Sequence, residues 1–237
     1  MASTDLSYIR HRQGELRRAV RRSSPVLVYS GTIGIIVVAI DKNPVYHRVG
    51  QILDRMACVS RGEFVASQLV HRIAAHEAYG MVGMLKSRGE EVLISDAAVQ
   101  KVSTLLARQY NNPLGDTLPV ETTIVQLRES PASDYMAHIG IDGSTQLFDR
   151  VRYLGSLGDS EEPQRADEKL GKLEQFNASL RERWTDLENI SALIEWLGEF
   201  PEAAPLLSTE HRRDVVLLNR ERFLAGDYED IFERLTL

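Results

Sequence analysis

The sequence predicts a mixed α/β fold of the α+β class. In this fold two sheets lie between layers of helices. Two observations predict this fold class. Short apolar runs rich in Val and Ile, which favour extended backbone, alternate with longer stretches of helical period. The elements follow the order strands, two helices, strands, two helices and strands. We expect residues 1–237 to form one domain, because this length can bury a sizeable core.

The first predicted element is an amphipathic helix with a basic face. Helical spacing of apolar residues extends over 3–22, and we assign 8–22 to the helix and 1–7 to a tail ahead of it. Ser23-Ser24-Pro25 ends the helix, because a proline disfavours helical backbone in the residue before it. Six arginines crowd the polar side of this helix: Arg10, Arg12, Arg17, Arg18, Arg21 and Arg22.

Three apolar runs follow the helix and predict the first strands. Residues 25–29 and 34–40 are joined by the turn-forming Ser30-Gly31-Thr32, and residues 56–60 form the third run. The run 34–40 is apolar without alternation, which predicts that both of its faces are buried. A buried helical turn has the same pattern, but the short length and the glycine at its start favour a strand. We expect the three runs to belong to the first sheet.

The rest of the chain continues the alternation of helices and strands. A helical pattern covers 63–86, and a second begins near Ser95 and Asp96, which are candidate capping residues. The pair Asp142-Gly143 predicts a hairpin turn. Helices are expected within 160–198, and further strands at 120–128, 135–141, 146–151, 153–158, 214–222 and 230–236.

The composition is typical of a globular protein and gives no global sign of a charged partner. Apolar residues make up 43% and charged residues 26%, and the net charge is −6, so neither nucleic acid nor an anionic membrane is an expected partner. The single cysteine, Cys58, excludes an intrachain disulfide. No apolar run approaches the roughly 18 residues of a membrane span, and the N-terminus lacks the apolar core of a signal peptide. We expect a soluble, cytoplasmic protein.

Several blocks of sequence, covering most of the chain, carry a family resemblance. They are RHRQGELRRAVRRSSPVLVYSGTIGIIVVAID (10–41), RVGQILDRMACVSRGEF (48–64), IDGSTQLFDRV (141–151), YLGSLG (153–158) and the terminal DVVLLNRER and DIFERLT segments. Their order resembles the proteasome family, and within it the α-type subunits of bacterial, actinobacterial-like core particles. The resemblance implies the four-layer αββα sandwich of N-terminal-nucleophile hydrolases. The chain resembles a divergent member, because Arg48 stands where many relatives carry lysine and Glu63 where a small or apolar residue is common.

The resemblance also implies a function in intracellular protein degradation. An α-type subunit is non-catalytic, and copies of it form an outer ring of seven that gates the entry of protein substrates. The ring templates the catalytic β-type subunits and docks a regulatory ATPase or another activator. These proteins, together with further copies of the chain, are the partners that the resemblance implies. It implies no catalytic residue, no cofactor and no metal in this chain, and neither a membrane nor a nucleic acid as partner.

Two groups of site residues follow from the same resemblance. Arg48, Gly62 and Glu63 would line a pocket between neighbouring subunits that receives the C-terminal carboxylate of the activator. The chemistry is suitable, because a guanidinium can bind a carboxylate through two hydrogen bonds. A solvated surface arginine is the alternative for Arg48. The gate would consist of the first seven residues, for which an ordinary frayed terminus is the alternative: Met1, Ala2, Ser3, Thr4, Asp5, Leu6 and Ser7.

Two other function classes stay open. A self-contained hydrolase would cut its own chain before Thr32 and use the new amine as its base. Asp41 could serve as the catalytic aspartate, but Arg48 stands in place of the catalytic lysine and a guanidinium is poor at proton transfer. A turn residue is the simpler interpretation of Thr32. A nucleic-acid-binding module would use the arginines of 8–22, although no aromatic residues are interleaved with them.

The histidines, the cysteine and the tryptophans are expected to have structural roles and do not indicate a functional site. His71 and His76 are five residues apart and do not share a helix face, so they predict no metal site. Cys58 lies in an apolar strand and is expected to be packing. Trp184 and Trp196 are expected in the core between helices and a sheet.

Overall fold

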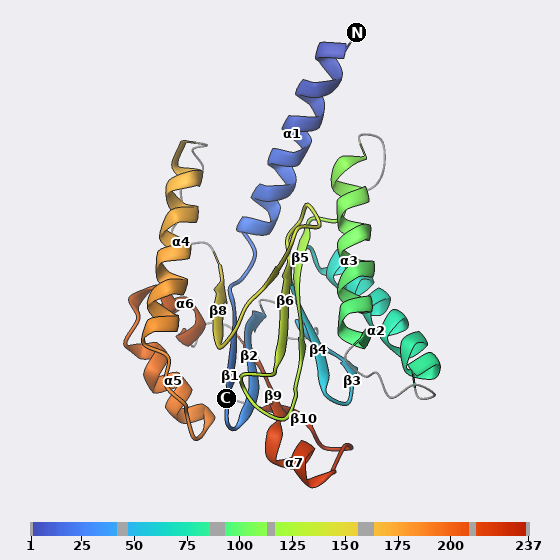
Figure 1. The fold of residues 1–237 in the computed structure, drawn as a ribbon. Coiled ribbons are helices and arrows are strands. Elements are labelled where there is room, and N and C mark those ends of the chain that lie inside the picture. The colour runs from blue at the N-terminus through green and yellow to red at the C-terminus, as the bar shows by residue number, and fades with distance from the viewer. Residues whose placement is uncertain are drawn as a thin grey trace. The chain divides into compact units, whose positions relative to one another are not determined.

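The fold is known from a computed structural model, which describes residues 2–41, 47–85, 93–112, 117–155, 164–208 and 212–235. It is a mixed α/β structure with two five-stranded sheets, in which every strand pair of defined register is antiparallel (Figure 1). The chain divides into two compact units. Unit 1 comprises Met1–Ser23, Gly50–Gln126 and Met136–Leu147, and unit 2 comprises Ser24–Val49, Leu127–Tyr135 and Phe148–Leu237.

Unit 2 contains the first sheet, sheet A, with the strand order β10-β9-β2-β1-β8. Its strands are β1 (Val26–Gly31), β2 (Gly34–Asp41), β8 (Val151–Leu154), β9 (Arg212–Asn219) and β10 (Phe232–Leu235). Its helices are α4 (Gln164–Glu182), α5 (Ile190–Gly198), the 3-10 turn η1 (Pro201–Ala203), α6 (Ala204–Leu207) and α7 (Arg220–Ala225). Strand β1 is an interior strand, because it pairs with β2 on one side and with β8 on the other.

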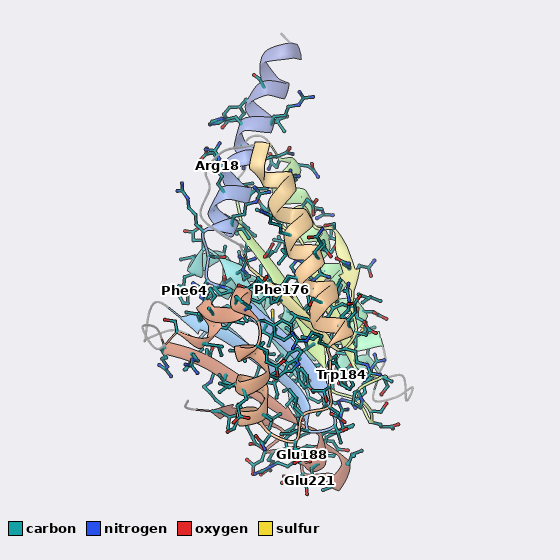
Figure 2. The ribbon with its side chains drawn as sticks, turned by 90° about the vertical axis from the view of Figure 1, so that its left-hand side faces the viewer. Arg18, Phe64, Phe176, Trp184, Glu188 and Glu221 are labelled. Carbon is teal, nitrogen blue, oxygen red and sulfur yellow. The ribbon has the colours of Figure 1, made fainter. Side chains whose placement is uncertain are left out.

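An aromatic cluster joins sheet A to α4 and α5. Figure 2 labels Phe176 of α4 and Trp184, which lies just beyond α4. Phe176 meets Tyr153 edge-to-face at 5.2 Å between ring centroids, and Trp184 stacks on Tyr29. Asn177 fixes α4 to β8 by accepting a hydrogen bond from the Tyr153 amide at 2.7 Å and donating one to its carbonyl at 3.0 Å. Trp196 is buried in the same cluster. The expected core position is confirmed for Trp196, whereas Trp184 is partly buried and packs against this core.

Sheet A is buried on both faces in its central strands. One face, which includes Leu27 and Tyr29, belongs to the core shared with α4 and α5. Alternate residues on the opposite face, such as Val28, Ile35 and Val37, have no exposed surface either. The unbroken apolar run in 34–40 therefore predicted a doubly buried strand correctly.

Sheet B has the strand order β3-β4-β5-β6-β7 and, except for its residues Val49 and Tyr135, belongs to unit 1. The strands are β3 (Val49–Leu53), β4 (Met56–Gly62), β5 (Val120–Gln126), β6 (Tyr135–Ile139) and β7 (Thr145–Leu147). The helices are α1 (Ala2–Arg21), α2 (Phe64–Leu85) and α3 (Leu93–Asn111). Helices α2 and α3 pack on each other and on β4 and β5. Small buried residues four apart in α2 allow this close approach: Ala66, Val70, Ala74 and Ala78.

Several expectations about the elements are wrong. The strand expected at 146–151 is divided between β7 (Thr145–Leu147) and β8 (Val151–Leu154), and Ser95 and Asp96 lie within α3 and do not cap it. The apolar run at 56–60 is β4 of sheet B and does not join the first sheet, because β2 is already paired along its length with β1 and β9. The strand expected at 214–222 ends at Asn219, whose side chain accepts a hydrogen bond from the Arg222 amide and caps α7. The loop before β4 contains a strand, β3, that was not predicted. The alternating order of strands and helix pairs is confirmed.

Candidate functional site

Gly62 and Glu63 form the connection between β4 and α2 in unit 1. Gly62 has φ +127°, and a Cβ atom there would lie 2.0 Å from the carbonyl oxygen of Pro119. The Glu63 amide donates a hydrogen bond to the same oxygen at 3.0 Å. The Glu63 carbonyl in turn accepts from the Ser67 amide and hydroxyl, at 2.9 and 2.8 Å, which begins α2. The Glu63 side chain is exposed, so this turn is rigid in its backbone and accessible at its surface.

Arg48 belongs to unit 2 and is half-buried. It directly precedes Val49, the first residue of β3. The prediction that Arg48, Gly62 and Glu63 share one pocket stays a prediction, since they are described within different units.

Arg61, next to Gly62, was not singled out from the sequence. Its side chain is 5% exposed and forms an ion pair with Glu121 of β5. It also donates hydrogen bonds to the carbonyl oxygens of Val20 and Ser23, each at 3.4 Å. A buried guanidinium therefore ties the end of α1 to β4 immediately before the candidate site. The only sequence signal was the Arg-Gly pair that closes the apolar run 56–60.

Six of the seven predicted gate residues belong to the first helix and are not a tail ahead of it. Ala2, Ser3, Thr4, Asp5, Leu6 and Ser7 belong to α1, and Met1 lies outside the described residues. The assignment of the helix to 8–22 is therefore wrong at its start, because no proline or glycine interrupts the helical pattern between residue 2 and Gly14. Leu16 and Val20 anchor the helix as its buried apolar side chains. A gating role of the first turns stays a prediction.

Thr32, the alternative nucleophile, lies in the tight turn between β1 and β2. Its backbone amide donates to Asp186 Oδ1 at 2.7 Å, and its hydroxyl donates to Asp186 Oδ2. Thr32 is exposed in this turn, and its simpler interpretation as a turn residue is confirmed. Asp41 lies at the opposite end of β2, roughly 23 Å of extended backbone away from Gly34. The structure therefore does not bring the proposed catalytic aspartate to Thr32.

A buried ion pair forms hydrogen bonds with residues next to the β1–β2 turn. Arg220 and Asp134, whose side chains are 3% and 0% exposed, meet at 2.7 Å. Arg220 also donates to the carbonyl oxygen of Gly31 at 3.2 Å, and Ser30 donates through its hydroxyl to Asp134 at 2.6 Å. Asp134 accepts a further hydrogen bond from the Arg128 amide at 2.8 Å. The arrangement fixes three chain segments to one another, which is a structural role.

A chain of buried hydroxyls surrounds Cys58 on the helix-covered face of sheet B. Thr122 donates to the carbonyl oxygen of Val59 at 3.0 Å, so its oxygen accepts from Cys58 and Ser60, at 3.1 and 2.8 Å. Ser60 lies 3.0 Å from His71 Nε2. Because the Ser60 proton is used toward Thr122, His71 must donate from Nε2. These contacts satisfy every member of the chain and leave no reactive thiol.

Cys58 is expected to be inert toward thiol reagents in the folded protein. Burial raises the pKa of Cys58 to about 12, so the thiol stays protonated and is not nucleophilic at about pH 8. A disulfide reagent such as Ellman's should modify no thiol in the native protein and, after denaturation in guanidinium chloride, the single thiol of each chain. Rapid modification of the native protein would contradict the described packing.

No protein-family model matches this chain, and no curated protein matches it. Among the described residues, no three His, Cys, Asp or Glu side chains are grouped so that they could hold a metal ion. None of the helices in the described part of the chain has the combination of length and apolarity that a membrane span needs. The membership of the proteasome family stays a prediction from the sequence blocks.

Proposed function

We propose that the chain is a non-catalytic α-type subunit of a bacterial proteasome-like core particle. The observation that carries the proposal is the interior position of β1 in sheet A, directly before the turn that contains Thr32. A threonine hydrolase of this class needs a free amine at its nucleophile. Cleavage before Thr32 would detach β1, which pairs with both β2 and β8 in the middle of sheet A. The described hairpin thus favours the structural subunit over the self-contained hydrolase.

The proposal includes the αββα arrangement of the family that the sequence resembles. Helices cover one face of sheet A through the core shared with α4 and α5. Helices α2 and α3 cover sheet B at β4 and β5. The second face of sheet A is apolar at Val28, Ile35 and Val37, and that of sheet B carries the apolar Ala57 and Val59. Each sheet therefore has one helix-covered face and a second face with apolar residues, as a layered fold needs.

In this role the chain would assemble with copies of itself into a ring that controls access to a catalytic ring of β-type subunits. Arg48, Gly62 and Glu63 would receive the carboxylate end of an activator, and the first turns of α1 would restrict the channel. Taken separately, the half-buried guanidinium of Arg48 is a group that binds carboxylates, and the rigid turn at Gly62 leaves the Glu63 side chain exposed. Degradation of protein substrates would be a property of the assembled particle.

Electron microscopy with intact-mass measurement tests the proposal. The chain would be purified alone and together with a β-type candidate encoded beside it. We expect a ring or stacked-ring particle that contains the full-length chain. A monomer whose mass corresponds to a chain beginning at Thr32, and which cleaves peptides by itself, would show that the hydrolase alternative is correct.

Thr32→Ala gives a second test of the hydrolase alternative. The substitution removes the hydroxyl contact with Asp186 but keeps the backbone hydrogen bond. We expect peptide hydrolysis by the assembled particle to be unchanged and the free energy of unfolding to fall by about 0.5–1.5 kcal/mol. Thr32→Ser, which keeps the hydroxyl, is the matched control. Loss of hydrolysis in Thr32→Ala, with retention of folding, would identify Thr32 as a nucleophile.

A further inference from the structure

Val49, which follows Arg48, forms hydrogen bonds through both its amide and its carbonyl group with the side chains of Asp214 and Arg234. Asp214 of β9 accepts a hydrogen bond from the Val49 amide at 2.9 Å. Arg234 of β10 donates to the Val49 carbonyl at 2.7 Å. Asp214 and Arg234 also form an ion pair with each other. The two side chains therefore hold Val49 as a neighbouring strand would, with one donor and one acceptor.

Asp214 and Arg234 lie on adjacent, hydrogen-bonded strands of sheet A. Arg234 is opposite Val216, so it lies diagonally across from Asp214 on the adjacent strand. Strand β9 is itself paired on both sides, with β2 and β10. The Asp214 side chain is 1% exposed. A buried carboxylate is costly unless each of its oxygens is paired, and here the Val49 amide and Arg234 supply the partners.

The same pair also contacts the residue before Arg48. Arg234 Nη1 lies 2.8 Å from His47 Nδ1. A guanidinium can only donate, so Nδ1 must accept and a neutral imidazole keeps its proton on Nε2. His47 is 43% exposed and 3.5 Å from Asp214. Both neighbours of Arg48 in the chain are therefore held by the Asp214–Arg234 pair.

We propose that Asp214 and Arg234 are positioning residues for a peptide-carboxylate site formed by Arg48. The inference rests on the proposed function and adds residues that the resemblance did not supply. A carboxylate is bound well only if its donors are fixed before it arrives, because ordering a loop at that moment costs affinity. By fixing residues 47 and 49, the pair restricts the backbone from which the Arg48 side chain extends.

The test measures how strongly the full-length protein, in the ring assembly found by microscopy, distinguishes a free peptide carboxylate from an amide. The probe is a pentapeptide of Gly, Ala and Leu with a fluorescent label at its N-terminus, prepared with a C-terminal carboxylate or a C-terminal amide. Anisotropy titration gives the ratio of the two affinities. We expect a ratio of about tenfold for the unmodified protein, because one charge-assisted contact distinguishes the peptides. Arg48→Ala should reduce the ratio to near one.

The double variant Asp214→Ala with Arg234→Met is the decisive one, since it removes both charges and leaves neither buried alone. We expect the ratio of carboxylate to amide affinity in the double variant to fall to within about twofold of the ratio in Arg48→Ala. The double variant would then have lost the preference for the carboxylate. Hydrogen exchange should show faster exchange of the Val49 amide but not of the amides of β2. Val216 is a buried residue of β9 that lies opposite Arg234. The Val216→Ala variant controls for a general loss of stability and should keep the tenfold affinity ratio.

Each other outcome overturns the inference in a distinct way. If the double variant keeps the ratio, Asp214 and Arg234 do not position the site, although rings seen by microscopy would leave the proposed function intact. If Val216→Ala loses the ratio equally, the effect is global destabilisation. If the unmodified protein and Arg48→Ala do not differ, the carboxylate site itself is absent.

Discussion

Asp134→Ala is expected to lower the free energy of unfolding by about 3–5 kcal/mol. The substitution leaves the Arg220 guanidinium, which is 3% exposed, without its carboxylate partner in the interior. It also removes the acceptor for the Ser30 hydroxyl and the Arg128 amide. The cost is large because a buried charge that loses its partner has no water to replace it. Chemical denaturation followed by circular dichroism gives the difference.

Two variants make this prediction specific. Asp227→Ala removes a carboxylate that is 49% exposed and 3.6 Å from Arg222, and it should change the free energy of unfolding by less than about 1 kcal/mol. Replacing both partners, as in Asp134→Leu with Arg220→Met, should recover much of the loss, since no charge is then left buried alone. An Asp134→Ala protein as stable as Asp227→Ala would show that the buried pair is not maintained in solution.

Gly62→Ala is the second substitution with a large expected effect. The backbone at Gly62 has φ +127°, a conformation that costs a residue with a side chain about 1–3 kcal/mol. The new Cβ atom would also stand 2.0 Å from the carbonyl oxygen of Pro119, so the β4–α2 connection must move. We expect a loss of stability at or above that range, together with weaker binding of a carboxylate-ended peptide if Gly62 lines its site.

Gly80→Ala is the matched control for Gly62→Ala. Gly80 lies in α2, is exposed, and has no atom within 4 Å of the position that a Cβ would take. Alanine favours the helix over glycine, so this variant should gain up to about 1 kcal/mol in the free energy of unfolding. If the two variants behave alike in thermal and chemical denaturation, then the strained turn at Gly62 is not present in the protein.

Local patterns in the sequence were enough to predict most individual elements. Continuous Val and Ile predicted β2, and apolar residues four apart predicted α2, because these patterns depend only on the period of the backbone. The membership of each sheet was not predictable in this way. Strand β4 follows β2 in the chain, but β9 near the C-terminus takes the position beside β2. Local sequence carries no information about such distant pairing.

The candidate site shows the same limit. Arg48, Gly62 and Glu63 were identified by resemblance, and periodicity alone would have left Arg48 as a surface arginine. The Asp214–Arg234 pair was not predicted, because a buried charge pair looks like solvated charge in a single sequence. Helix α7 did have local signals, with Asn219 as its cap and Gly226 in left-handed conformation at its end, but the apolar run of β9 extends up to them and masked the boundary.

The interior position of β2 has a consequence for the synthesis of the chain. Its partner β9 ends at Asn219, which is 178 residues after Asp41 (219 minus 41), so the ribosome delivers it late. At the usual rate of translation β2 would wait on the order of 10–40 s with one edge unpaired. An apolar, unpaired edge can associate with other nascent chains. The interval before β9 emerges is therefore when the edge of β2 is most open to association with other chains.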